Sequence, residues 1–279
     1  MITSIITARG GSTRTINKNG RLFCGVPLLA WSIIQSKTAK LVGETYLTTD
    51  SEEYARIGEY YGAKIIMRPV WDNGVTAGVA FAHAIHAIEA EQENKLDDVL
   101  TMLPTSPLKK PGQMDELIEA YRKAKVDTIT TAAPVKETYV FKNCKGSYWD
   151  RFQEHSLGEH YQAKMVIGDK FWKYSRMCGG WGISKRDYYL HTAENQPELD
   201  IVIDTAPINK KLKWDFFPVE DWQLFEIDYP EDFSLCEAIM EHMILKGKNA
   251  KVYGKDVPLW EEEKINMLLG KYAGNSNQQ

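Results

Sequence analysis

Short runs of β-branched and apolar residues alternate with longer amphipathic stretches from Met1 to about Pro134. This alternation is typical of parallel strands joined by crossover helices, so we predict a wound α/β sheet. The predicted strands are Thr3–Thr7, Thr45–Thr48, Lys64–Met67, Val99–Leu103 and Thr128–Ala132. The predicted helices are Leu28–Lys40, Ser51–Tyr61, Thr76–Gln92 and Gly112–Lys125.

The pattern changes after Pro134, where aromatic residues arrive without a clear helical or strand period. Acidic residues are interleaved among them, which argues against a single-strand nucleic-acid surface because such a surface needs a positive groove. Aromatic residues are also enriched at protein interfaces, so we interpret this region as a contact surface. The sheet pattern then returns, with strands predicted at Asp200–Asp204 and Gln223–Ile227 and helices at Pro230–Leu245 and Lys251–Lys271. The predicted units are a nucleotide-binding core at 1–135, an arm at 136–190 and a return to the core at 191–279.

Composition narrows the classes of partner. The chain has 279 residues and a formal net charge of −4, so it offers no general electrostatic attraction to nucleic acid or to an anionic membrane. Its four cysteines include no CxxC pair, which favours reduced thiols in a cytoplasmic protein. We expect neither a nucleic acid nor a membrane as partner.

A glycine-rich turn follows the first predicted strand, in the run Ala8-Arg9-Gly10-Gly11-Ser12-Thr13-Arg14. Ligands in open α/β sheets bind beyond the carboxyl ends of the strands. Paired glycines let backbone N–H groups approach an anion closely, and Arg9, Arg14 and Lys18 add charged donors. The spacing fits neither a P-loop nor a dinucleotide fingerprint. A triphosphate site fits this chemistry, and a tight turn with solvated basic residues is the alternative.

Five runs of the sequence are similar to one known family. They are ITARGGSTRTINKN, FCGVPLLAWSI, LTTDSEEYARIGEYYGAKIIMRP, MLPTSPLK and FEIDYPEDFSLCEAI, and they appear in the family's order. The chain resembles the acylneuraminate cytidylyltransferases, which activate sialic-acid-like sugars as CMP conjugates. The resemblance implies a Rossmann-like mixed sheet of the nucleotide-diphospho-sugar transferase type with a protruding dimerisation arm. It also implies a homodimer that transfers CMP from CTP to a keto sugar acid and releases pyrophosphate.

The resemblance assigns roles to residues that match the family's motifs. Arg9, Lys18 and Asp228 are the implied catalytic residues, with Arg9 and Lys18 on the triphosphate. Asp50, in the run that matches the family's STD motif, is interpreted as a residue that orients the end of a strand. The implied nucleotide-binding residues are Ala8, Arg9, Gly10, Gly11, Ser12, Lys18, Asn19, Arg68 and Thr76, the last two for the cytosine base. The implied acceptor-binding residues are Leu103, Thr105, Ser106, Lys173 and Arg176.

Two carboxylates near the C-terminal end are candidate ligands for Mg²⁺, the expected cofactor. Glu226 and Asp228 are separated by one residue, so on a strand they would point to the same face. Mg²⁺ takes oxygen ligands, and the family has paired aspartates here, with Glu226 replacing the first. The alternative is that Asp228 caps the helix beginning at Pro230. We favour metal binding by Asp228 and leave Asp232 as the cap-region residue.

The chain departs from the family in the loop and in the sugar pocket. Thr13 stands where lysine is usual, Leu103 where glutamine is usual, Cys178 for asparagine and Gly182 for tyrosine. The lost polar groups indicate a site built for different hydroxyl or acyl groups, because pocket polarity follows the substrate. Two alternatives therefore stay open. One is a cytidylyltransferase for another acid, such as an octulosonic acid or a phosphonate, and the other is a nucleotide-sugar binding protein with weakened turnover.

Overall fold

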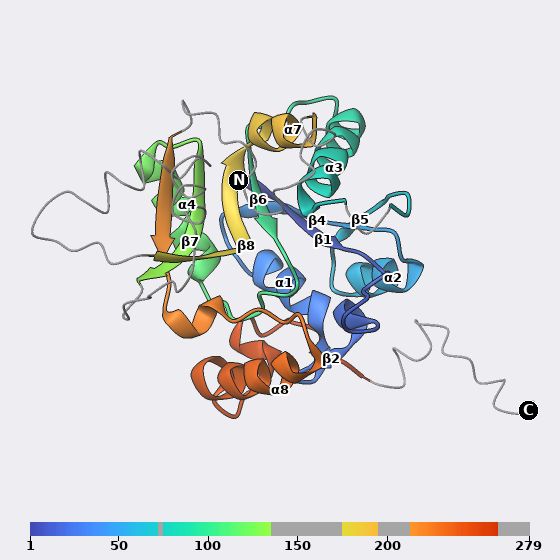
Figure 1. Cartoon of the computed structure of the whole chain (residues 1–279), viewed down its shortest axis with the longest axis vertical. Coiled ribbons are helices and arrows are strands. Elements are labelled where there is room, and N and C mark those ends of the chain that lie inside the picture. The colour runs from blue at the N-terminus through green and yellow to red at the C-terminus, as the bar shows by residue number, and fades with distance from the viewer. Residues whose placement is uncertain (72–74, 135–174, 195–212, 262–279) are drawn as a thin grey trace, which may run out of the picture.

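A seven-stranded mixed sheet forms the centre of the protein, with strand order β5-β4-β1-β6-β8-β7-β9 (Figure 1). The computed structural model describes residues 1–71, 75–134, 175–194 and 213–261. The strands are β1 (Ile2–Ala8), β4 (Val42–Thr49), β5 (Lys64–Met67), β6 (Asp98–Met102), β7 (Thr128–Pro134), β8 (Ser175–Lys185) and β9 (Trp214–Pro218). A separate two-stranded hairpin pairs β2 (Leu22–Phe23) with β3 (Val26–Pro27).

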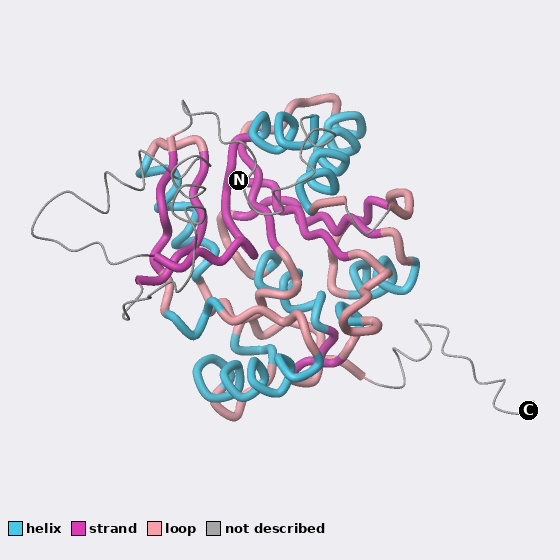
Figure 2. The backbone as a smooth tube through the Cα atoms, viewed as in Figure 1, coloured by secondary structure: helices cyan, strands magenta, loops and turns pink. Residues whose placement is uncertain are grey.

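Helices lie on both sides of this sheet (Figure 2). They are α1 (Leu28–Lys37), α2 (Glu52–Tyr60), α3 (Ala77–Gln92), α4 (Gln113–Ala124), α7 (Arg186–Glu194) and α8 (Pro230–Ile239). Short 3₁₀-helices are η1 (Lys18–Gly20), η3 (Asp221–Leu224) and η5 (Ala250–Val252). The segment η4 (Met240–Leu245) is a π-helix. Within the described part of the chain, no helix is long and apolar enough to cross a membrane.

The two faces of the sheet bury separate cores because successive side chains of a strand point to opposite faces. Ile5 of β1 joins a cluster with residues of α3 and α7, and both helices cover that face. Ile6, the next residue, joins the larger cluster that includes residues of α1, α2, α4 and α8. The neighbouring α3 and α7 are tied together by Arg186, whose Nε and Nη2 lie 2.6 and 2.7 Å from the Glu89 carboxylate.

The alternating pattern before Pro134 correctly predicts the strands and helices of this region. All five predicted strands are present, and β5 has the predicted bounds Lys64–Met67. All four predicted helices are present, each one to three residues shorter than expected at one or both ends. Ser51 caps the start of α2, since its hydroxyl accepts the Tyr54 N–H at 3.4 Å.

The boundary of the predicted arm is wrong at its C-terminal end. Residues 175–185 form β8, which pairs antiparallel with both β6 and β7 in the middle of the sheet. The following residues form α7, which packs on α3. The two antiparallel pairings also make the sheet mixed, as predicted. The remainder of the predicted arm, 136–174, lies outside the described residues.

Two further expectations near the C-terminus fail, and one holds. Gln223–Ile227 is not a strand, because Glu220 and Gln223 form a capping box that begins the 3₁₀ turn η3, and an extended segment follows. The helix predicted from Pro230 is confirmed as α8, which continues into η4. The helix predicted at Lys251–Lys271 is wrong for its described part, since residues 253–261 contain no α-helix. The rest of that helix, and the strand predicted at Asp200–Asp204, lie outside the described residues.

Gly182 has a packing role in the sheet, where it pairs with Thr101 of β6 and Thr130 of β7. A Cβ atom at Gly182 would lie 2.6 Å from the backbone carbonyl oxygen of Ile129. The interpretation of Gly182 as a lost sugar contact is therefore wrong, because strand packing accounts for the glycine.

We expect Gly182→Ala to lower the free energy of unfolding by about 1–3 kcal/mol, the usual cost of overpacking. Urea denaturation measures this change. Gly11→Ala is the matched control, since an added Cβ there meets nothing within 4 Å. Equal stability of the two variants would show that the β7 backbone yields to the methyl group.

Candidate active site

A cavity of about 450 Å³ opens at the carboxyl ends of β5, β4, β1 and β6. This volume lies within the usual range of small-molecule sites, roughly 300–1,000 Å³. The parallel pairing of these four strands aligns their carboxyl ends, so residues far apart in sequence meet here. The lining residues include Arg9 and Ser12 to Thr15 after β1, Asp50 after β4, Arg68 and Trp71 after β5, and Leu103 to Thr105 after β6.

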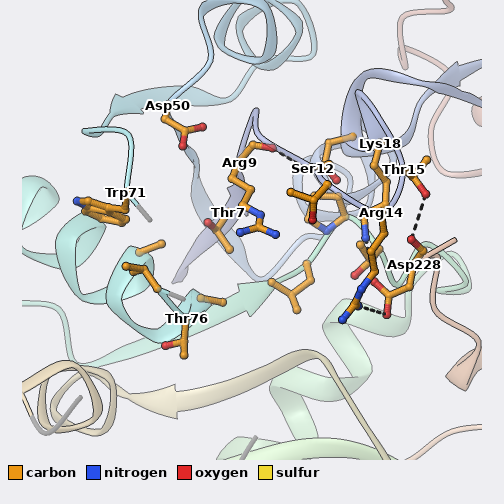
Figure 3. Close-up of a pocket in the computed structure, with 18 of the residues that line it drawn as sticks. Thr7, Arg9, Ser12, Arg14, Thr15, Lys18, Asp50, Trp71, Thr76 and Asp228 are labelled. Atoms are coloured by element: carbon orange, nitrogen blue, oxygen red, sulfur yellow. Dashed lines mark hydrogen bonds and ion pairs between the residues drawn. The ribbon is translucent and has the colours of Figure 1, made fainter. Parts of the chain in front are cut away.

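Positive side chains gather around the turn that follows β1. Figure 3 shows the Arg9 side chain pointing into the middle of the cavity, with Arg14 and Lys18 on the side of Asp228. Asn19 fixes this turn, since its amide Nδ2 donates to the Arg9 carbonyl oxygen at 3.4 Å. The turn thus presents three cationic groups to one cavity, which is the chemistry predicted for a triphosphate site.

The Lys18 side chain is only 13% exposed, against 62% for that of Arg14. Its Nζ donates to the Ile227 carbonyl oxygen and to Asp228 Oδ1, each at 2.9 Å. Arg14 Nη1 lies 3.7 Å from Asp228 Oδ2, and the Thr15 hydroxyl donates to the Asp228 carbonyl oxygen at 3.1 Å. The loop after β1 is therefore fastened to the segment before α8 at a half-exposed carboxylate.

Asp228 does not cap α8. The capping carboxylate belongs to Asp232, whose Oδ2 accepts the backbone N–H groups of Asp228 at 2.8 Å and of Tyr229 at 2.7 Å. Asp232 is therefore confirmed as the cap-region residue. The Asp228 carboxylate remains directed at the cavity, beside Lys18 and Arg14 (Figure 3).

Glu226 lies apart from the cavity and accepts the Ser106 hydroxyl hydrogen at 2.9 Å. The expectation that it shares a face with Asp228 depended on a strand that does not form. Among the described residues, no three His, Cys, Asp or Glu side chains lie close enough together to hold a metal ion. The structure thus brings Asp228 to the cavity and leaves Glu226 hydrogen-bonded to Ser106 of the loop after β6.

A second charged group occupies the opposite end of the cavity. Arg68 Nη1 lies 3.1 Å from Asp50 Oδ2, and both side chains are buried. The Arg68 guanidinium carbon lies 4.7 Å from the centre of the Trp71 ring, a cation–π distance. Burial lowers the pKa of the Arg68 guanidinium, and the nearby Asp50 carboxylate opposes that shift. Thr76, the other residue expected to contact the base, also lines the cavity.

The residues predicted to bind the acceptor divide into three groups. Leu103 and Thr105 line the cavity. Ser106 is buried and holds Glu226 instead. Lys173 lies outside the described residues, and Arg176 is placed only by its backbone in β8.

The predicted nucleotide-binding residues mostly line the cavity, namely Arg9, Ser12, Lys18, Asn19, Arg68 and Thr76. Three others do not: Ala8 is buried at the end of β1, and Gly10 and Gly11 shape the turn without lining the cavity. Trp71 was missed, because a lone tryptophan after a strand matches no motif. The sequence feature that could have indicated Trp71 is its position three residues after Arg68, beyond the end of the same strand.

The profile of the cytidylyltransferase family matches residues 3–206. This match covers more than half of the chain, which therefore belongs to the cytidylyltransferase family. The solved structure of a CMP:2-keto-3-deoxy-manno-octonic acid synthetase complexed with CTP has the same fold, with a TM-score of 0.58 at 16% identity. That comparison covers 88% of this chain and 100% of the other. The nucleotide-diphospho-sugar transferase type of fold predicted from the sequence is thus confirmed.

Curated relatives differ in how much of their length this chain matches. The N-acylneuraminate cytidylyltransferase of Escherichia coli O18:K1:H7 is 31% identical over 121 residues, or 43% of this chain. This chain spans only 28% of that protein. The post-translational flagellin modification protein B of Campylobacter coli is 27% identical over 247 residues, covering 88% of this chain and 97% of the relative.

Proposed function

We propose that this chain transfers CMP from CTP to a sialic-acid-like keto sugar acid. In this step the anomeric hydroxyl oxygen attacks the α-phosphorus in line, and the hydroxyl proton is lost to solvent. The bond from the α-phosphorus to the oxygen that bridges to the β-phosphate breaks, and pyrophosphate leaves with that oxygen. Family membership and the name of the E. coli relative support this reaction.

One observation carries the proposal: a single cavity has cations from its middle to one end and a buried arginine beside an aromatic ring at the other end. Arg9, Arg14 and Lys18 match a triphosphate, while Arg68 and Trp71 match a base. Phosphoryl transfer asks a protein mainly for positioning and for positive charge near the reacting oxygens. Lys18 and Arg9 would stabilise the charge that develops on the departing pyrophosphate.

Magnesium is the proposed cofactor, and Asp228 is the residue that fits it. Mg²⁺ is commonly held by one or two carboxylates together with substrate phosphates and water, so a single half-exposed carboxylate in the cavity is sufficient. When bound, the ion would neutralise charge on the phosphate oxygens. Glu226, which is held by Ser106, is proposed as a second ligand only if this contact opens.

The acceptor, the assembly and the location are further parts of the proposal. The apolar Leu103 at the cavity wall supports an acceptor with fewer polar contacts there than a sialic acid makes through glutamine. Homodimerisation through residues 136–174 rests on the aromatic composition and the family resemblance. Residence in the cytoplasm rests on the cysteine pattern.

A pyrophosphate-release screen tests the function by crossing four nucleoside triphosphates with a panel of keto sugar acids, octulosonic acids and phosphonates. We expect release only with CTP and Mg²⁺, and with at least one keto sugar acid. Release with CTP and only an octulosonic acid or a phosphonate would favour the alternative acceptor. Release with another nucleotide in preference to CTP would contradict the proposal.

A second candidate is a nucleotide-sugar binding protein without turnover. It is favoured by Glu226, which is engaged by Ser106 instead of facing the cavity, and by Thr13 in the position of the usual lysine. Thermal shift distinguishes the two candidates. Stabilisation by CTP and Mg²⁺ without pyrophosphate release from any acceptor would support the binding protein.

A further inference from the structure

Asp50 is an unexpected group to find in a cavity for an anion. Its side chain is only 7% exposed, and it lines the same cavity as Arg9 and Lys18. A buried carboxylate repels a triphosphate, and its burial costs free energy unless it is paired and hydrogen-bonded. The contacts of Asp50 therefore indicate which interactions compensate for the cost of burying its carboxylate.

The sheet places Asp50 between the two functional ends of the cavity. Asp50 follows β4, which lies between β1 and β5. The register aligns Ala8, Thr49 and Met67 at the ends of these three parallel strands. The residues that come next are thus the phosphate-binding turn on one side of Asp50 and Arg68 on the other.

Each carboxylate oxygen of Asp50 holds one of these neighbours. Oδ1 accepts the Gly10 backbone N–H at 2.7 Å, and Oδ2 lies 3.1 Å from Arg68 Nη1. Gly10 is seated closely against the start of α2, because a Cβ there would lie 3.1 Å from Ser51 Cβ. One carboxylate thereby fixes the turn and the arginine relative to one another.

Arg68 retains a donor that nothing in the described structure uses. Its Nε is buried and has no hydrogen-bond partner among the described residues. An unused buried donor is costly, so a site that keeps one is adapted to a ligand that supplies the acceptor. The carbonyl oxygen and ring nitrogen of cytosine are acceptors of this kind. The guanidinium can present this donor in a fixed direction because Asp50 holds its Nη1.

We propose that Asp50 is a positioning residue that sets the geometry between the phosphate-binding turn and the base-reading Arg68. The role rests on the proposed function, in which Arg68 contacts the base. In this role Asp50 acts through its contacts with Gly10 and Arg68. It ensures that a triphosphate seated on the turn has its base in reach of Arg68.

Two probes separate the two halves of this role without requiring turnover. Inorganic tripolyphosphate reports on the turn and is measured by calorimetry, and cytidine reports on Arg68 and is measured by ligand-observed NMR. In Asp50→Asn the amide oxygen can still accept the Gly10 N–H, while the ion pair with Arg68 is lost. We expect cytidine affinity to fall about tenfold, the scale of one charged hydrogen bond, with tripolyphosphate affinity within about twofold.

Two further variants control for folding and for charge. Asp50→Ala loses both contacts, so affinity for both probes should fall. Glu52→Gln removes an exposed ion pair with Arg56 on the neighbouring α2 and should change neither affinity. If Asp50→Asn is too unstable to measure, pairing it with Arg68→Met removes the uncompensated buried cation. That double variant should lose cytidine affinity and keep tripolyphosphate affinity.

The outcomes separate this role from the proposed function. An equal loss of both affinities in Asp50→Asn would mean that Asp50 only supports the fold. Unchanged cytidine affinity would mean that Arg68 does not depend on Asp50 for its orientation. Either result overturns the role of Asp50 while the wild-type preference for cytidine over uridine sustains the proposed function. A wild-type protein that binds tripolyphosphate but shows no such preference would overturn both.

Discussion

Lys18→Ala is expected to lower turnover by about 10²–10³-fold, the usual scale for loss of one preorganised electrostatic contact. The Lys18 amine is already positioned at the cavity, held at 2.9 Å by both the Ile227 carbonyl oxygen and Asp228. It therefore needs little reorganisation when negative charge develops on pyrophosphate. The measurement is kcat from pyrophosphate release, with CTP and the best acceptor of the screen.

Lys64→Ala is the matched control for Lys18→Ala. Lys64 is half-exposed on β5, where it pairs with Glu44, and it does not line the cavity. Surface pairs of this kind contribute little, so turnover should stay near the wild-type rate. A Lys18→Ala enzyme as fast as the Lys64→Ala enzyme would contradict the assigned role of Lys18.

Asp228→Asn is expected to raise the Mg²⁺ concentration for half-maximal rate by about tenfold or more. Removal of a charged contact costs roughly 1.5–3 kcal/mol, and 1.4 kcal/mol is about a factor of ten in affinity. The asparagine oxygen can still accept the Lys18 amine hydrogen, so the change acts mainly on charge at the cavity. A Mg²⁺ titration of the rate at saturating CTP measures the effect, and sugar binding measured without CTP should change less.

Asp232→Asn separates metal binding from helix capping. Asp232 accepts two backbone N–H groups at the start of α8 and does not line the cavity. Its replacement should lower stability without moving the Mg²⁺ titration. If Asp228→Asn also leaves the titration unchanged, Asp228 acts only as the anchor of Lys18.

The first half of the fold could be predicted because its signals are local. Each strand of β1, β4, β5, β6 and β7 carries its own apolar run. Of the helices between them, α2 and α4 carry an amphipathic period, whereas α1 is an apolar helix that is buried on all sides. The position of β8 could not be predicted in this way. Its sequence SRMCGGWGISK lacks a strand period, and its stability comes from long-range pairing with two strands far earlier in the chain.

The cavity could be predicted in part, for the same reason. Arg9, Lys18 and Arg68 follow strands whose ends meet, so motif order was enough to group them. The place of Glu226 was wrong because it depended on a strand that a capping box at Glu220 replaces with a turn. The double contact of Asp50 was also beyond sequence reasoning, since it depends on side-chain directions at the ends of three strands.

The central position of β8 has a consequence for how the chain is made. β6 and β7 are complete by Pro134, but neither pairs with the other, and the strand that joins them begins only at Ser175. During synthesis both strands therefore emerge with open edges, which are prone to pair with other chains. The β5-β4-β1-β6 half of the sheet, which carries most of the cavity, can form first, and closure of the other half must wait for β8. A chain truncated before Ser175 would lack β8, so the open edges of β6 and β7 would make it prone to aggregate.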